Sequence, residues 1–120
     1  MDCEEDLFCG LNYADKDPDE MDVLEKKHTP VIDVESLGED RYRVTVKVGE
    51  YKEHPNEHNH FIESIELYSG RTFLGRATFA SARSDPVATF EVKLDHKHPF
   101  VAFERCNMHG TWRSEEVELG

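Results

Sequence analysis

The chain lacks a long hydrophobic run and has few cysteines, and both shortages limit what it can be. No stretch of its 120 residues is apolar enough for a transmembrane helix, and Met1 to Asp6 carry acids where a secretory signal needs a basic stretch followed by an apolar one. Its three cysteines are an odd number for a disulfide framework, so free or metal-bound thiols are expected. We therefore expect a cytoplasmic protein that does not enter a membrane.

Positive charge is also scarce. The chain has 14 Lys and Arg against 26 Asp and Glu, a net charge of −12, which argues against binding to the phosphates of nucleic acid. Ten of these acids lie within residues 1–25 beside a single base, Lys16, so the remainder is close to neutral. We expect residues 1–25 to be an acidic leader, flexible or loosely docked, and residues 26–120 to form one domain. Cys3 and Cys9 in the leader cannot alone supply a four-thiolate metal site, and no role is expected for them.

From Val31 onward, apolar and polar residues alternate with the period of β-strands. The clearest case is Arg41–Val48, where valines fall on one face, and turn residues such as Ser69-Gly70 and Asp85-Pro86 separate the candidate strands. The expected strands are Val31–Val34, Arg41–Val48, Phe61–Tyr68, Thr72–Phe79, Ala88–Leu94, Phe100–Arg105 and Glu115–Leu119. About seven short strands without a long helical pattern predict an all-β fold, an immunoglobulin-like antiparallel β-sandwich.

Histidines gather in three places expected to be loops or strand ends. His28 precedes Thr29-Pro30, His54 and His60 bound one loop, and Cys106 stands three residues before His109. A rigid sandwich can direct side chains from separate loops to one point. Cys106 and His109 can both face one ion across a tight turn, with Gly110 relieving the backbone just after it. Together these three groups predict a metal site.

Other interpretations stay open for single residues. Exposed polar loops collect histidines, so His58, His96 and His98 are expected to be ordinary surface residues. Viewed alone, His54 and His60 are equally well explained as solvated loop residues. Cys106 alone is equally well explained as a small buried side chain.

The donor types narrow the choice of metal. Imidazoles suit zinc, copper, iron and nickel, whereas one thiolate among several imidazoles favours a copper or iron redox site over structural zinc. A cupredoxin-like electron-transfer protein with blue copper is the main alternative. Such a site adds a weak axial methionine, but no methionine follows His109, and the imidazoles outnumber those that blue copper needs. Iron with one open position is therefore favoured.

Three motifs give the chain a family resemblance: Lys27-His28-Thr29-Pro30, His54-Pro55-x4-His60 and Cys106-Asn107-x-His109-Gly110-x-Trp112. Over roughly Lys26 to Leu119 the chain resembles the superoxide reductases, specifically the one-iron neelaredoxin type related to desulfoferrodoxin. The resemblance implies an enzyme that reduces superoxide to hydrogen peroxide at one non-haem iron per chain, cycling between Fe2+ and Fe3+. It also implies an external electron donor such as rubredoxin and a homo-oligomer, either a tetramer or a dimer.

The same resemblance assigns roles to individual residues. It makes four histidines the equatorial ligands and a cysteine the axial thiolate: His28, His54, His60, His109 and Cys106. It places Lys27 beside the open sixth position, where its charge would draw in superoxide and orient water for proton delivery. We also expect backbone amides of Met108 and His109 to donate hydrogen bonds to the Cys106 sulfur.

One position departs from the family pattern. The family commonly has glutamate directly before the lysine, where it can cap oxidised iron, whereas this chain has Lys26 there and Glu25 one residue earlier. Either Glu25 reaches in through a shifted loop, or the ferric site is capped by water, by hydroxide or by nothing. We favour the second alternative, because moving a residue by one position changes its direction substantially.

Overall fold

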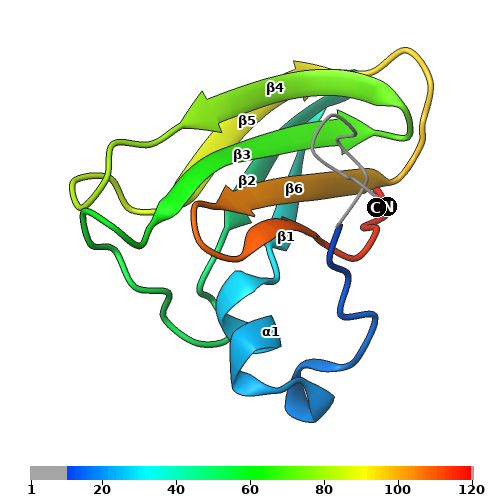
Figure 1. Cartoon of the computed structure of the whole chain (residues 1–120). Coiled ribbons are helices and arrows are strands. Elements are labelled where there is room, and N and C mark those ends of the chain that lie inside the picture. Colours follow the sequence, from blue (N-terminus) through cyan, green and yellow to red (C-terminus); the bar gives the residue numbers. More distant parts are fainter. Residues whose placement is uncertain (1–10, 120) are drawn as a thin grey trace, which may run out of the picture.

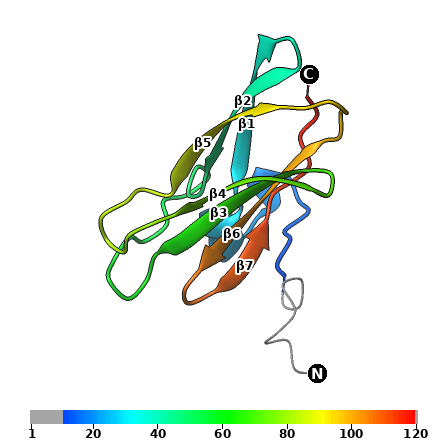
Figure 2. The same cartoon turned by 90° about the horizontal axis from the view of Figure 1, so that it is seen from above.

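The computed structural model describes residues 11–119 and forms a two-layer β-sandwich (Figures 1 and 2). Its strands are β1 (Val31–Gly38), β2 (Arg41–Lys47), β3 (Ile62–Ser69), β4 (Thr72–Thr78), β5 (Val87–Lys93), β6 (Phe100–Cys106) and β7 (Gly110–Arg113). One sheet has the order β1-β2-β5 and the other β4-β3-β6-β7, with every neighbouring pair antiparallel. The prediction of an all-β, immunoglobulin-like sandwich is confirmed.

Alternation along the strands builds the core between the sheets. In β2, Tyr42, Val44 and Val46 are buried while Arg41 and Lys47 at the strand ends are exposed, which is the period-two pattern of a strand with one solvated face. Ile65 and Leu67 of β3 are completely buried and belong to the same core cluster. Burying one such side chain contributes about 1.5–3 kcal/mol. The core therefore makes a rigid frame from which the loops project.

The prediction of a seventh strand at Glu115–Leu119 is wrong. Strand β7 is Gly110–Arg113, which forms a hairpin with β6 across the short turn after Cys106, and Val117 makes only an isolated bridge to Phe100. The alternation of Val117 and Leu119 imitates a strand. Pairing beside β6 is instead decided by the local turn, because strands joined by a short connection meet at little entropic cost.

A short helix, α1 (Val23–His28), was not expected. Asp22 begins it with a capping box: its side chain accepts the Glu25 N–H, and the Glu25 side chain accepts the Asp22 N–H. Pro30 lies just beyond the helix, where the residue before a proline is driven out of the helical conformation. His28 is therefore in the last turn of a helix, not at a strand end or in a loop as expected.

Residues 11–25 make defined contacts with the sandwich. The backbone of Asn12 donates to the Thr111 carbonyl and accepts from the Arg113 N–H, both at 2.9 Å, so the segment pairs with the outer edge of β7. Helix α1 crosses the expected boundary between residues 25 and 26, and that boundary stays a prediction. Cys3, Cys9 and the rest of residues 1–10 lie outside the described residues. Within residues 11–119, no helix has the length and apolar character needed to cross a bilayer.

Candidate metal centre

Four histidines from three separate segments meet beside α1, which carries the first of them, His28. Their imidazole rings form a closed cycle in which each ring contacts the next edge-on, and we call them the four-histidine cluster: His28, His54, His60 and His109. The ring centroids of neighbouring pairs are 4.7, 4.9, 5.1 and 4.9 Å apart around the cycle. The sequence-predicted histidines are thus brought together around one point.

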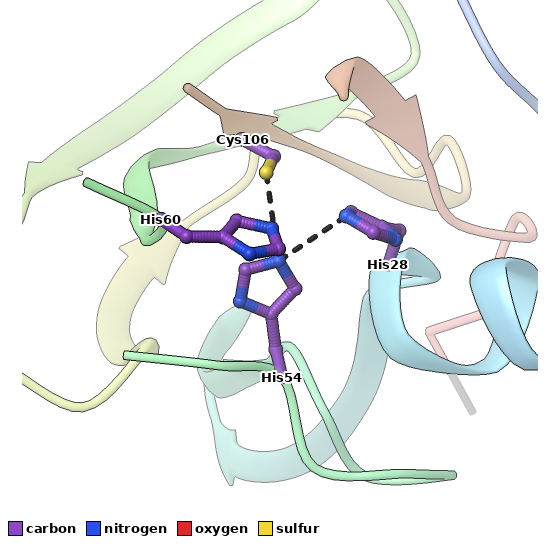
Figure 3. Close-up of side chains that lie close together, drawn as sticks. All are labelled: His28, His54, His60 and Cys106. Atoms are coloured by element: carbon purple, nitrogen blue, oxygen red, sulfur yellow. Dashed lines mark hydrogen bonds between the residues drawn. The ribbon is translucent and has the colours of Figure 1, made fainter. Parts of the chain in front are cut away.

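A cysteine joins this cluster (Figure 3). One donor atom from each of His28, His54, His60 and Cys106 lies within 4.8 Å of all the others. The sulfur is 3.5 Å from His54 Nε2 and 3.8 Å from His109 Nδ1, so His109 stands beside this tight group of four. The arrangement presents up to five nitrogen and sulfur donors to one small volume, and three of the five side chains are at least 95% buried: His28, His54 and Cys106.

Hydrogen bonds fix the direction in which two imidazoles point. His28 Nδ1 is 2.8 Å from the Leu24 carbonyl, and His54 Nδ1 is 2.6 Å from the Pro55 carbonyl. Because a carbonyl only accepts, both Nδ1 atoms carry the proton, and in neutral rings both Nε2 atoms carry a lone pair. These two Nε2 atoms face each other at 3.1 Å without a proton between them. A bound cation removes this repulsion, so the donor set fits a metal ion.

Burial favours the neutral, metal-binding form of three of the imidazoles, those of His28, His54 and His60. It lowers the pKa of His54 to about 4 and also lowers the pKa of His28 and of His60. The buried His60 Nε2 has no hydrogen-bond partner among the described residues. A buried, unpaired nitrogen is costly unless it binds something, and a metal would satisfy it.

The environment of Cys106 controls the charge on its sulfur. Burial raises the pKa of the Cys106 thiol, while hydrogen bonds from the backbone N–H groups of Met108 and His109 lower it. These are the two amides expected to contact the sulfur. Gly110, at φ +79°, takes the left-handed conformation that ends the turn. The turn therefore supplies one thiol donor, two amides that stabilise a thiolate, and His109.

Asn107 locks the turn to the loop that carries His60. Its side-chain oxygen accepts the Phe61 N–H at 2.9 Å, and its side-chain amide donates to the Asn59 carbonyl at 2.9 Å. The two bonds grip the backbone on either side of His60. Asn107 belongs to the predicted Cys-to-His motif, but its separation of 46 to 48 residues from its partners hid this role from the sequence.

Trp112 and Asn12 support the other side of the cluster. The indole of Trp112 stacks on His28 at 5.0 Å between centroids, and its N–H donates to the His109 carbonyl at 3.1 Å. The Asn12 side-chain amide donates to the Thr111 carbonyl at 3.1 Å and is 3.5 Å from the His109 carbonyl. Sequence reasoning placed Trp112 in a family motif without a role and missed Asn12 altogether.

Two charged residues of α1, Lys27 and Glu25, differ in how they relate to the cluster. The charge of Lys27 helps to lower the pKa of both His28 and His60, so it acts on the cluster directly. The Glu25 carboxylate oxygen instead lies 3.0 Å from the Asp22 N–H and 3.0 Å from Lys16 Nζ. Glu25 is thus engaged as a helix cap and an ion-pair partner.

A buried acid also lies close to the cluster and was not foreseen. Glu104 is two residues before Cys106, so the two side chains share one face of β6. Glu104 is 1% exposed, and neither carboxyl oxygen has a hydrogen-bond partner among the described residues. Burial raises its pKa well above 4.5, so the carboxyl adds little negative charge beside the sulfur.

The three histidines set aside from the sequence are exposed. His58 lies in the turn between His54 and His60 with its side chain in solvent, and His96 and His98 are exposed in the β5–β6 loop. None of the three belongs to the four-histidine cluster.

Comparisons with known proteins agree with this site. One family model, Desulfoferrodoxin, matches residues 20–115. The superoxide reductase of Pyrococcus horikoshii is 40% identical over 100 residues, covering 75% of this chain and 85% of that protein. The superoxide reductase (neelaredoxin) structure from Archaeoglobus fulgidus in the reduced form has a TM-score of 0.73 and 31% identity, and the match covers 92% of this chain and 98% of that one. The superoxide reductase structure from Nanoarchaeum equitans has a TM-score of 0.70 and 33% identity, and the match covers 78% of this chain and 94% of that one. The chain belongs to the desulfoferrodoxin family.

The lowered histidine pKa values predict a pH dependence of stability in the metal-free protein. In the unfolded chain His54 titrates near its usual value of about 6.5, so below that pH the unfolded state binds more protons and the free energy of unfolding falls. With the pKa of folded His54 at about 4, this residue alone should remove about 2 kcal/mol between pH 7 and pH 5. Urea denaturation at the two pH values measures the loss.

A pair of variants isolates that effect. His54→Leu should lose less stability between pH 7 and pH 5 than the unchanged protein, whereas His58→Leu, altered at an exposed histidine, should lose as much. Equal losses in all three proteins would contradict the assignment.

The grip of Asn107 predicts a loss of metal retention. Asn107→Ala removes both bonds that flank His60, so a bound metal ion should be released to a chelator about tenfold faster, in line with losses seen for residues that orient metal ligands. Asn59→Ala is the matched control, because Asn107 binds only the backbone carbonyl of Asn59. Similar release rates in the two variants would show that the Asn107 side-chain hydrogen bonds do not affect metal retention.

Proposed function

We propose that this chain is a superoxide reductase, which adds one electron and two protons to superoxide to give hydrogen peroxide. The family, the relatives that carry this name and the clustered histidines and cysteine support it. The observation that carries most weight is the pair of opposed Nε2 lone pairs of His28 and His54, 3.1 Å apart. This pair requires a cation at the same place at which the family motifs predict iron.

We assign the ligands residue by residue. The four-histidine cluster supplies four imidazole nitrogens and Cys106 supplies a thiolate, with one iron per chain. Iron bound there would supply the electron by passing from Fe2+ to Fe3+, and the thiolate would tune how readily it does so. The amides of Met108 and His109 would moderate the sulfur by hydrogen bonding, and Asn107 and Trp112 would keep the imidazoles in place.

Lys27 is assigned to the substrate. Superoxide is an anion, and a protein of net charge −12 repels it at long range. Lys27 lies in the last turn of α1 and its charge reaches His28 and His60, so it offers a local attraction at the cluster. Its ammonium would also hold water from which protons reach the reduced oxygen.

We further propose that no carboxylate of α1 caps the oxidised site. The Glu25 side chain is held by the Asp22 N–H and by Lys16, at the opposite end of the helix from His28. Reaching the cluster would break the capping box, which is worth about 1 kcal/mol or more. Water, hydroxide or no ligand would take the sixth position in this chain.

The remaining assignments follow the family resemblance. We propose that an external donor such as rubredoxin returns the electron, that the chain forms a homo-oligomer, a tetramer or a dimer, and that it works in the cytoplasm. Residues 26–120 would form the catalytic domain, with residues 1–25 as an acidic leader.

Pulse radiolysis of the iron-loaded protein tests the reaction. Reduction yields hydrogen peroxide without dioxygen, whereas dismutation yields both. Dioxygen released with peroxide would contradict the proposal, as would copper in place of iron in the natively purified protein, which would favour the cupredoxin-like alternative.

Removal of the Lys27 charge should slow capture of superoxide. Lys27→Ala is expected to reduce the second-order rate by a factor on the order of ten at low ionic strength, and the difference should shrink as salt screens the charge. Lys26→Ala makes the same charge change in the same helical turn and should have a smaller effect. If both variants slow the reaction equally, only overall charge matters.

Loss of the thiolate should separate binding from activity. Cys106→Ser is expected to keep iron on the four imidazoles but to lose the ferric thiolate absorption band and the reduction of superoxide. Met108→Ala, which changes a side chain that is 60% exposed in the same turn, should keep both signals. An unchanged spectrum in Cys106→Ser would show that Cys106 is not a ligand of the iron.

A further inference from the structure

A second pair of histidines lies at the other end of strand β6. His96 and His98 are in the loop between β5 and β6, two to four residues before Phe100, whereas Cys106 is the last residue of that strand. A strand rises about 3.3 Å per residue, so the length of β6 puts roughly 20 Å between this loop and the sulfur. The pair is therefore separate from the four-histidine cluster.

The two rings have the mutual geometry found within the cluster. Their centroids are 5.0 Å apart and their planes are inclined at 83°. Neighbouring pairs of the four-histidine cluster are 4.7 to 5.1 Å apart with planes inclined at 62° to 85°. This spacing is what two imidazoles need to share one ion, since metal–nitrogen bonds of about 2.0–2.1 Å at roughly tetrahedral or square angles bring ring centroids to about 5 Å.

A carboxylate orients one of the two rings. Asp95 Oδ1 lies 3.0 Å from His96 Nδ1. A carboxylate this close to one ring nitrogen favours the proton on that nitrogen and so leaves the lone pair of the other nitrogen free, which is the usual arrangement behind a metal-binding histidine. In His28 and His54 the corresponding Nδ1 atoms are hydrogen-bonded to carbonyl groups.

The backbone under the second ring is held in place. Ser69 Oγ donates to the His98 carbonyl at 2.8 Å, and the Gly70 N–H donates to the Pro99 carbonyl at 3.0 Å. Gly70 has φ +57°, and a Cβ there would stand 3.0 Å from His98 Cβ. The β3–β4 turn thus supports His98 closely while both imidazoles stay open to solvent.

Charged neighbours limit the strength of any binding. Arg71 lines the same surface hollow as the two histidines and repels a cation, while Lys97 pairs with Asp40 at 3.8 Å. Asp95, whose side chain is 97% exposed, supplies the compensating negative charge. Two imidazoles with water completing the coordination therefore describe a weak, exchangeable site.

We propose that His96 and His98 together bind a divalent transition-metal ion, with Asp95 orienting His96. Imidazole selects ions of the Ni2+, Cu2+ and Zn2+ type over Mg2+ or Ca2+. The site does not depend on iron or on superoxide chemistry, so its test is independent of the proposed function.

Calorimetric titration of the iron-loaded protein with Ni2+ tests this proposal. Cys3→Ser and Cys9→Ser should be present in every protein compared, so that the leader thiols do not compete. We expect one Ni2+ per chain, which is lost in the His96→Ala/His98→Ala variant and kept in His58→Ala, altered at another exposed histidine. Asp95→Asn should weaken binding by about tenfold.

Two results would overturn the proposal: no bound Ni2+, or binding that persists in the double variant. Without added Ni2+, the melting temperature should be the same for the unchanged protein, for His96→Ala/His98→Ala and for His58→Ala, because all of the altered side chains are exposed. A changed stoichiometry then reports the site itself.

Discussion

Two imidazole lone pairs facing each other at 3.1 Å are the constraint on which the rest of the structure depends. Neutral rings repel in this position, and burial prevents them from taking up protons to relieve it. The fold holds both rings from behind through the Leu24 and Pro55 carbonyls. The site is thus prepared for a cation before one arrives, because its donors cannot turn away to find other partners.

Holding such donors together requires a stiff frame, and the sandwich supplies it through contacts that cross long stretches of sequence. His54 is 26 residues from His28 and 52 from Cys106. Asn107 grips the backbone around His60, and Trp112 packs His28 against the turn that carries His109. The core fixes the strands, and a few side-chain contacts transmit that order to the four-histidine cluster and Cys106.

The sequence predicted most of what depends on local pattern, with helix α1 and strand β7 as exceptions, and missed what depends on distant contacts. Alternating residues located six strands and the fold, and the placement of His28, His54, His60, Cys106 and His109 predicted the cluster that the structure brings together. Helix α1 carried a readable signal, the Asp22-x-x-Glu25 capping box, which the search for long helical periods passed over. The role of Asn12 could not be read in this way, because Asn12 meets its partners 97 to 99 residues along the chain. Strand β7 was missed for a different reason: it follows from the short turn after Cys106, whereas the alternation of Val117 and Leu119 pointed to a strand further along.

The contact between Asn12 and β7 also bears on how copies of the molecule avoid sticking to one another. β7 is the last strand of its sheet, and a free sheet edge invites another chain to add a strand. Asn12 occupies the outward N–H of Arg113 and the outward carbonyl of Thr111. The family match begins only at residue 20, so a chain shortened to that match would expose this edge beside His109 and become prone to edge-to-edge aggregation.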